Sequence, residues 1–142
     1  MGTFEIHYRV SYSDTDQMGF MHHSNYLKCY ETARWELFRH LGIPYAAIEE
    51  AGFLFPVTEA KLRFIRPLKY DQEVVITTRV MGVSGARILF GYQMTDEDGE
   101  IFNEAEVKVG CAGKTTGKAL PLPKQVREIL SIIENGSSIL RK

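Results

Sequence analysis

Apolar and polar residues alternate at the start of the chain. Apolar side chains occupy every second position from residue 4 to residue 12, namely Phe4, Ile6, Tyr8, Val10 and Tyr12. Since successive side chains of a strand point to opposite faces, this pattern predicts a half-buried strand over residues 4–12. The polar segment 13–19 follows, holds a glycine, and is expected to form a loop.

The period changes to that of a helix between residues 24 and 41. Apolar residues recur there at intervals of three and four positions: Tyr26, Leu27, Tyr30, Ala33, Leu37, Phe38 and Leu41. This spacing predicts one long amphipathic helix. Ser24 or Asn25 is expected to cap its start, and Gly42 is expected to end it. A short helical turn is predicted over residues 45–51.

Four more segments show the alternation of strands, at residues 58–65, 74–81, 86–95 and 101–111. Turn-forming residues separate them, and connections this short favour antiparallel hairpins arranged as a meander. A short C-terminal helix is predicted over residues 124–134. We expect one domain over residues 1–135 and a frayed tail at 136–142.

This order of elements predicts an α+β protein in which one antiparallel sheet packs against one long helix. A single long helix is too little to cover a sheet of such long strands. A second copy of the chain is the most economical cover for the remaining apolar surface.

The 142 residues include 17 Lys and Arg against 18 Asp and Glu, a formal charge of −1. A near-neutral chain has no bulk attraction for nucleic acid or an anionic membrane, so its ligand must be recognised at a local site. The two cysteines, Cys29 and Cys111, form no zinc or redox motif. Charged residues near the start argue against a secretory signal, and no apolar run is long enough to span a membrane. We therefore expect a cytoplasmic protein without membrane insertion.

Polar and ionisable side chains are densest between residues 13 and 25, in the run SDTDQMGFMHHSN. This run leads into the predicted helix, whose free backbone N–H groups can polarise a carbonyl group. A carboxylate nearby can act as general base or nucleophile. The same residues also suit an ordinary turn and a helix cap, and composition alone favours that simpler interpretation.

The order of residues in this run is more informative than its composition. The run YSDTDQMG ends at Gly19. It is followed by His23, Asn25 and the aromatic Tyr26, and then by a helix that holds Tyr30, Glu31, Ala33 and Arg34. This arrangement resembles the acyl-CoA thioesterases of the 4-hydroxybenzoyl-CoA thioesterase and Tol-Pal-associated thioesterase group. The resemblance covers nearly the whole chain, including residues 64–68 and 85–87. It implies the hotdog fold, a five-stranded antiparallel sheet wrapped around one long helix.

The resemblance also implies roles for individual residues. Asp16 matches the catalytic carboxylate, which acts as nucleophile or as general base for water. Gly19 matches the glycine that turns the loop toward the helix. His23 falls at the helix start, where a backbone N–H points at the thioester oxygen. Tyr26 matches an aromatic residue that packs rather than reacts, and we place it among the substrate-binding residues.

Basic residues are expected to contact the phosphates of CoA, because an arginine binds phosphate in a bidentate manner. Arg87 is the main candidate and Arg66 a weaker one, although both also suit a solvated strand end. The chain departs from the family pattern at Gln17, Met18, Phe20, Met21 and His22, which leaves the acyl preference open.

Three other kinds of site have weaker support. The run GCAGKT at residues 110–115 looks like a phosphate loop, but its spacing is wrong and no helix follows. The motif holds metal-binding residue types, yet the adjacent histidines His22 and His23 point to opposite faces of an extended chain, so no metal site is predicted. Asp14 is expected to be structural, and Cys29 is expected to be a buried, inert thiol.

We therefore expect an acyl-CoA thioesterase that hydrolyses an acyl-CoA to a free acid and CoA without a metal or redox cofactor. The alternative is a non-catalytic module of the same fold that binds acyl-CoA or an acyl carrier protein. Two chains are expected to pair edge to edge as a homodimer, and dimers to pair as a homotetramer. The site would then lie between subunits.

Overall fold

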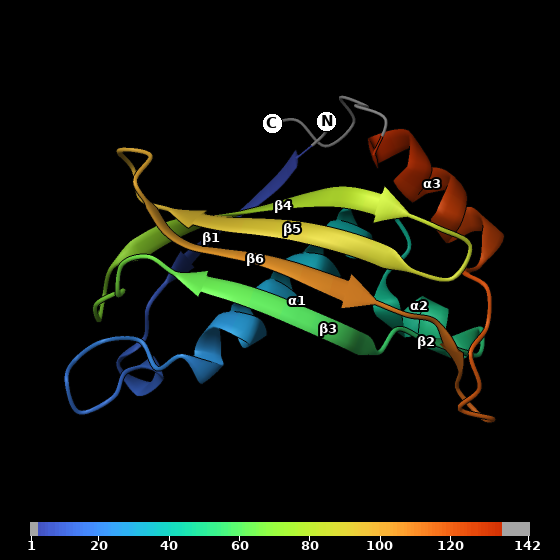
Figure 1. Ribbon diagram of the computed structural model, residues 1–142, viewed down its shortest axis with the longest axis horizontal. Coiled ribbons are helices and arrows are strands. Elements are labelled where there is room, and N and C mark those ends of the chain that lie inside the picture. Colours follow the sequence, from blue (N-terminus) through green and yellow to red (C-terminus); the bar gives the residue numbers. More distant parts are fainter. Residues whose placement is uncertain (1–2, 135–142) are drawn as a thin grey trace.

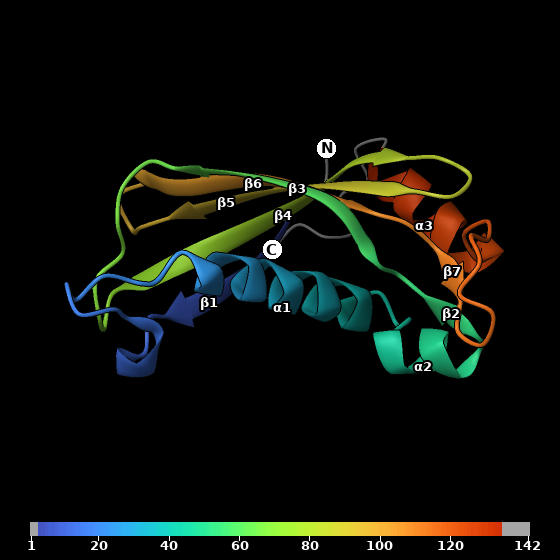
Figure 2. The ribbon, with the colours of Figure 1, turned by 60° about the horizontal axis from the view of Figure 1, so that its bottom comes forward.

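A computed structural model describes residues 3–134. Its centre is a five-stranded antiparallel sheet in the order β1-β4-β5-β6-β3, and α1 lies along one face (Figure 1, Figure 2). The strands are β1 Thr3–Arg9, β3 Val57–Phe64, β4 Glu73–Val83, β5 Ile88–Thr95 and β6 Ile101–Val109. The helices are α1 Ser24–His40, α2 Tyr45–Glu50 and α3 Lys124–Glu134. The predicted α+β class, sheet and helices are confirmed, whereas the predicted tail at 136–142 lies outside the described residues.

The core lies between α1 and the inner face of the sheet. The helix buries one face, made of Tyr26, Cys29, Tyr30, Ala33, Arg34, Leu37 and Phe38. Every second residue of β5 faces it, namely Ile88, Phe90, Tyr92 and Met94. Two polar contacts cross this core: the Tyr30 hydroxyl donates to Asn103 Oδ1 at 2.5 Å, and Arg34 Nη1 donates to the Tyr92 hydroxyl at 3.1 Å. They fix the helix against β5 and β6.

The predicted meander is confirmed for β4, β5 and β6, because β4 pairs with β5 and β5 pairs with β6. The expected hairpin between β3 and β4 is wrong, because β3 pairs with β6 at the far edge of the sheet. Beyond Phe64 the N–H groups of Ile65 and Arg66 donate to the Phe102 carbonyl at 3.0 and 3.1 Å. The connection is therefore held across the end of the sheet and does not turn back on β3.

The first strand is shorter than predicted. It ends at Arg9, and Tyr12–Asp14 form one turn of 3-10 helix, η1. The Asp14 carboxylate accepts the Ser11 N–H at 2.9 Å, a local contact that bends the chain out of the sheet. Tyr12 is consequently exposed instead of continuing the inner face of the strand.

A small second sheet was not predicted. It pairs β2, Phe53–Leu54, with β7, Ala112–Gly113. Strands of two residues are too short to show a period in the sequence. The strand predicted over residues 101–111 therefore ends at Val109, and the chain continues into β7.

Strand β3 is an open edge of the sheet. Within the described residues it has β6 as its one neighbour, and all of its side chains except the half-buried Leu62 are exposed. Its exposed residues include the large apolar side chains of Val57 and Phe64, and Ile65 follows directly. An unpaired strand edge with apolar side chains is a surface suited to pairing with another chain.

In the part of the chain that the structure describes, no helix is long and apolar enough to cross a membrane.

Candidate active site

The expected catalytic motif forms a tight turn at one end of the sheet. The Asp16 N–H donates to the Phe20 carbonyl at 2.9 Å, and the Gly19 N–H donates to the Asp16 carbonyl at 3.0 Å. Gly19 has a φ of 85°, in the left-handed region that glycine adopts without steric penalty. Thr15 and Met21 pair as an isolated bridge on either side of the turn. The loop-turning role expected for Gly19 requires this geometry.

The two oxygens of the exposed Asp16 carboxylate have different surroundings. Oδ1 accepts the Met18 N–H at 2.9 Å and, more weakly, the Phe20 N–H at 3.4 Å. Within residues 3–134 no hydrogen bond reaches Oδ2. One oxygen therefore holds the side chain over the loop, and the other is free to attack a carbonyl carbon or to accept a proton.

The helix α1 begins directly after this loop, with His23 at the N-cap position. The N–H groups of Ser24 and Asn25 bind His22, through its Nδ1 at 3.2 Å and its carbonyl at 3.0 Å. The His23 N–H has no acceptor in the described part of the chain. Because a helix N-terminus carries partial positive charge, this N–H is suited to donate to the carbonyl oxygen of a ligand.

The predicted cap of this helix is wrong. Ser24 is already its first residue, and the Ser24 hydroxyl lies 2.9 Å from His22 Nδ1. The Asn25 side chain turns back to donate to the Asp14 carbonyl at 2.8 Å. Both side chains thus bind the preceding loop, and neither caps the free N–H groups of the helix.

Tyr26 and Arg66 lie at the same end of the molecule as Asp16. Tyr26 is 2% exposed and packs edge-on against the ring of Phe64, with ring centroids 5.0 Å apart. Burial raises the pKa of its hydroxyl, against a smaller, opposite effect of a hydrogen bond with the Leu68 backbone. The phenol of Tyr26 is therefore held protonated and packed against the end of β3. Arg66 is exposed, and its Nη2 lies 3.7 Å from a carboxylate oxygen of Glu100.

Arg87 lies at the other end of the sheet. It stands in the turn between β4 and β5, where its N–H donates to the Ser84 hydroxyl at 3.2 Å. That turn and the loop before α1 occupy opposite ends of the sheet (Figure 1, Figure 2). The eight residues of β5 alone span about 26 Å. The structure therefore does not bring Arg87 and Asp16 together within one chain.

The weaker candidates do not form sites. Residues 110–115 contain the short strand β7, with no helix start beside it. Among residues 3–134, no three His, Cys, Asp or Glu side chains are grouped closely enough to hold a metal ion. Cys29 is buried, and burial, aided by the charge of Asp14, raises the pKa of its thiol to about 12. A thiol that ionises so poorly is a weak nucleophile.

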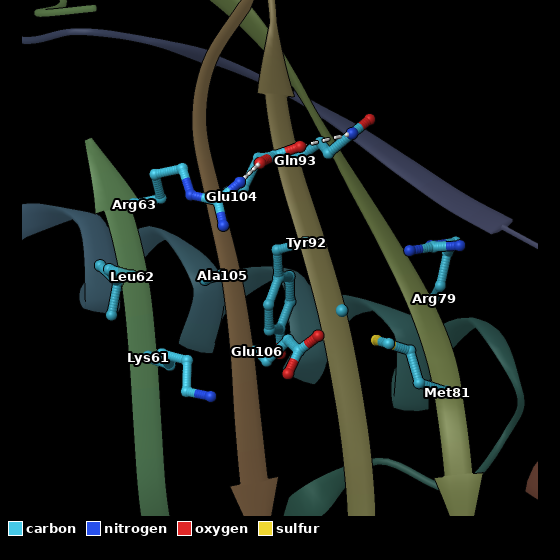
Figure 3. Close-up of a pocket in the computed structure, with 11 residues that line it drawn as sticks. Lys61, Leu62, Arg63, Arg79, Met81, Tyr92, Gln93, Glu104, Ala105 and Glu106 are labelled. Atoms are coloured by element: carbon cyan, nitrogen blue, oxygen red, sulfur yellow. Dashed lines mark hydrogen bonds and ion pairs between the residues drawn. The ribbon is translucent and has the colours of Figure 1, made fainter. Parts of the chain in front are cut away.

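A hollow of about 470 Å³ lies on the outer face of the sheet, opposite to α1 (Figure 3). Gly91 is one of its lining residues, and the Met81 sulfur lies 2.5 Å from the place that a Cβ atom of residue 91 would occupy, so the missing side chain makes room for Met81. Charged side chains surround it, and some are already paired: Glu104 accepts from Arg63 at 3.0 Å and from Gln93 at 3.1 Å. The hollow contains no residue of the Asp16 motif, and we do not assign the substrate to it.

Sequence reasoning missed Tyr8 as a residue of the site. Its hydroxyl donates to the Asp14 carboxylate, behind the loop that carries Asp16. The alternation of residues 4–12 marks Tyr8 as an inner-face residue of β1, but no motif signals a hydrogen bond to a loop six residues further on.

Comparison with known proteins places the chain in a family. The model of the Thioesterase-like superfamily matches residues 10–130, and the chain belongs to this superfamily. Its relatives include acyl-CoA thioester hydrolase YbgC of Escherichia coli O6:H1, 30% identical over 118 residues, which are 83% of this chain and 88% of the relative. Acyl-CoA thioesterase YbgC of Haemophilus influenzae is 32% identical over 125 residues, 87% of this chain and 91% of the relative.

A solved structure agrees with this assignment. The crystal structure of DHNA-CoA thioesterase from Staphylococcus aureus matches with a TM-score of 0.88 and 25% identity, over 96% of this chain and 97% of that one. The hotdog thioesterase fold expected from the sequence is thereby confirmed.

Proposed function

We propose that this chain is an enzyme that hydrolyses acyl-CoA thioesters to a free acid and CoA. The names of its relatives support this reaction. The observation that carries the proposal is a pair of groups without hydrogen-bond partners, one acceptor and one donor, at one end of the sheet. Asp16 Oδ2 and the His23 N–H each lack a hydrogen-bond partner in the described chain. Thioester hydrolysis needs a base or nucleophile together with a donor to the carbonyl oxygen.

The chemistry follows from these two groups. The His23 N–H donates to the thioester oxygen, where negative charge develops during attack. Asp16 either takes a proton from the attacking water or attacks the carbonyl carbon itself and forms an anhydride that water then hydrolyses. In both routes the C–S bond breaks and one water is consumed: its OH oxygen enters the acid product or the regenerated Asp16 carboxylate, and its protons are released to the thiolate and the solvent. These steps require no metal or redox cofactor.

The open edge of β3 supports an oligomeric enzyme. Phe64 is 53% exposed at the end of this edge and contacts Tyr26, the buried residue next to the helix start. A second copy paired along β3 would extend the sheet and cover these apolar side chains. We propose such a homodimer, with the site at the boundary between subunits and the partner forming part of the acyl channel. Pairing of dimers into a homotetramer stays a prediction.

The positions of the two arginines suggest how CoA is held. The segment that follows β3 carries Arg66 and is bound to the Asp16 loop, through Phe20 with Lys69 and Met21 with Leu68. The turn between β4 and β5 carries Arg87 and lies at the opposite end of the sheet (Figure 1). Antiparallel pairing of two β3 edges turns the far end of one sheet toward the Asp16 end of the other. We therefore propose that Arg66 of one chain and Arg87 of the partner subunit contact the phosphates of one CoA.

A panel of acyl-CoA substrates tests the proposed reaction. Purified protein is incubated with aromatic, short aliphatic and long aliphatic acyl-CoAs, and a thiol reagent detects released CoA. The reagent is suitable because both protein cysteines, Cys29 and Cys111, are buried. Release of CoA with turnover supports the hydrolase and identifies its acyl group. Binding of acyl-CoA without turnover would instead support the non-catalytic binding module.

A further inference from the structure

Asp14 precedes Asp16 by two residues, and its N–H, its carbonyl and one carboxylate oxygen, Oδ2, are all hydrogen-bonded inside the chain. Its N–H donates to the Ser11 carbonyl at 2.9 Å. Its carboxylate Oδ2 accepts the Ser11 N–H at 2.9 Å and also accepts from the Tyr8 hydroxyl. Each carboxylate of the motif therefore keeps one oxygen without a hydrogen bond in the described chain. They differ in what holds the other oxygen: the half-buried Asp14 is bound by Tyr8 of β1 and by Ser11, whereas the exposed Asp16 is bound only by the N–H groups of its own turn.

The carbonyl of Asp14 binds the other half of the site. It accepts the His22 N–H at 2.8 Å and the Asn25 side-chain amide at 2.8 Å. These two donors bracket His23, whose N–H is the proposed donor to the thioester oxygen. One residue thus connects β1, through its carboxylate, with the start of α1, through its carbonyl.

The Asp14 carboxylate is supported by a half-buried donor, the hydroxyl of Tyr8. Tyr8 is half-buried on the inner face of β1, and burial, followed by its hydrogen bond to Asp14, raises the pKa of its hydroxyl. Cys29 lies beside it and is itself held neutral by burial. The Tyr8 hydroxyl consequently stays protonated over the range in which an enzyme works and donates to Asp14 throughout.

We propose that Asp14 is a positioning residue for thioester hydrolysis, and that Tyr8 supports it. Together they fix the distance between the Asp16 carboxylate and the His23 N–H. This inference rests on the proposed function, because it assumes that the chain hydrolyses acyl-CoA thioesters. Neither residue contacts the substrate, so a loss of this support should lower kcat far more than it changes KM, since a misplacement of about 1 Å can slow a reaction by about a hundredfold.

Two substitutions of Asp14 separate positioning from chemistry. Asp14→Ala removes the acceptor for both Tyr8 and Ser11, and we expect kcat to fall by about tenfold or more with KM within about twofold of wild type. Asp14→Asn keeps one oxygen that can accept both hydrogen bonds, and it should retain kcat within about threefold. If Asp14→Asn is as inactive as Asp16→Asn, the Asp14 carboxylate takes part in the chemistry and the proposal is wrong.

Tyr8→Phe and a matched control guard against simple loss of folding. Tyr8→Phe removes one hydroxyl and should lower kcat in the same direction as Asp14→Ala. Asp96→Ala is the control, because Asp96 also accepts two backbone N–H groups in a turn, those of Asp98 at 3.0 Å and Glu100 at 2.9 Å. It should lose a similar amount of stability and leave kcat unchanged. An equal loss of kcat in Asp96→Ala would show that lowered stability alone explains the effect.

Amide hydrogen exchange gives a readout that does not depend on turnover. In Asp14→Ala and Tyr8→Phe the amides of residues 15–23 should exchange faster than in wild type, while Asp14→Asn should resemble wild type. Unchanged exchange in Asp14→Ala would overturn the positioning role, whatever the activity. If wild type hydrolyses no acyl-CoA but the exchange differences appear, the proposed function fails while the structural role of Asp14 stands.

Discussion

The Gly19 N–H donates to the Asp16 carbonyl at 3.0 Å from a backbone with a φ of 85°. The turn that carries Asp16, the proposed catalytic carboxylate, therefore depends on a conformation that residues with a Cβ atom rarely adopt. Space is not the constraint, because a Cβ atom at Gly19 would meet nothing within 4 Å.

Gly19→Ala should accordingly destabilise the protein by about 1–2 kcal/mol and lower kcat, because the turn must relax to a new backbone conformation. Urea unfolding and acyl-CoA hydrolysis measure the two effects. Gly85→Ala is the matched control: its Cβ also meets nothing within 4 Å, and Gly85 has no positive φ. That control should change stability by less than about 0.5 kcal/mol. Equal behaviour of the two variants would contradict this explanation.

The stability of the core should depend on Tyr92, because its hydroxyl accepts a hydrogen bond from the buried guanidinium of Arg34. Arg34 is buried and donates to the Tyr92 hydroxyl at 3.1 Å, and its Nε has no partner within the described residues. Tyr92→Phe should therefore cost about 1–3 kcal/mol, since it leaves a buried donor without an acceptor. Thermal or urea unfolding measures the loss. Tyr12→Phe, which removes an exposed hydroxyl, should be close to neutral.

Much of the architecture follows from periodicity, and the exceptions have local or long-range causes. The helix over residues 24–40 and the strand β5 show their periods clearly because one face of each is buried. The end of β1 is set instead by the contact of Asp14 with Ser11, which alternation does not reveal. The pairing of β3 with β6 joins strands that lie far apart in the sequence. The length of the connection after Phe64 therefore does not predict it.

The candidate site was predictable where a motif carries it. Asp16, Gly19 and His23 lie in one continuous run, so the resemblance alone brings them together, and the structure places them around one turn and one helix start. Tyr8 was not predictable, because its role arises from a hydrogen bond between a strand and a loop. The proposed relation of Arg87 to the site was not predictable either, since it requires a second chain to be paired in the proposed way.

Alkaline pH should destabilise the protein. The pKa of Cys29 is raised to about 12, and burial also raises the pKa values of Tyr8 and Tyr30. In the unfolded chain these groups lose protons at lower pH than in the folded one, so the free energy of unfolding falls as pH rises above about 9. Urea unfolding at pH 8 and pH 10 measures the difference. Cys29→Ala should reduce the pH dependence, and a stability independent of pH over this range would contradict the prediction.

The β3 edge should hold two chains together. Analytical ultracentrifugation of wild type should give at least the mass of a dimer, and Phe64→Glu should shift the protein toward monomer, because the charge falls in the proposed interface. Hydrolysis should fall together with assembly. Ile132→Glu is the control, since Ile132 is an exposed apolar residue on α3, and it should change neither property. A fully active wild-type monomer would rule out the shared site.

The most direct measurement is the hydrolysis rate of Asp16→Asn beside wild type. The amide keeps an oxygen that can accept the Met18 N–H, which Asp16 Oδ1 accepts at 2.9 Å, so the loop and the assembly should persist. Melting temperature and acyl-CoA binding, measured on the same samples, check that they do. The account predicts that kcat falls by about a hundredfold or more, because Asn can neither take a proton from water nor attack the thioester. A kcat equal to that of wild type would show that Asp16 is not the catalytic carboxylate.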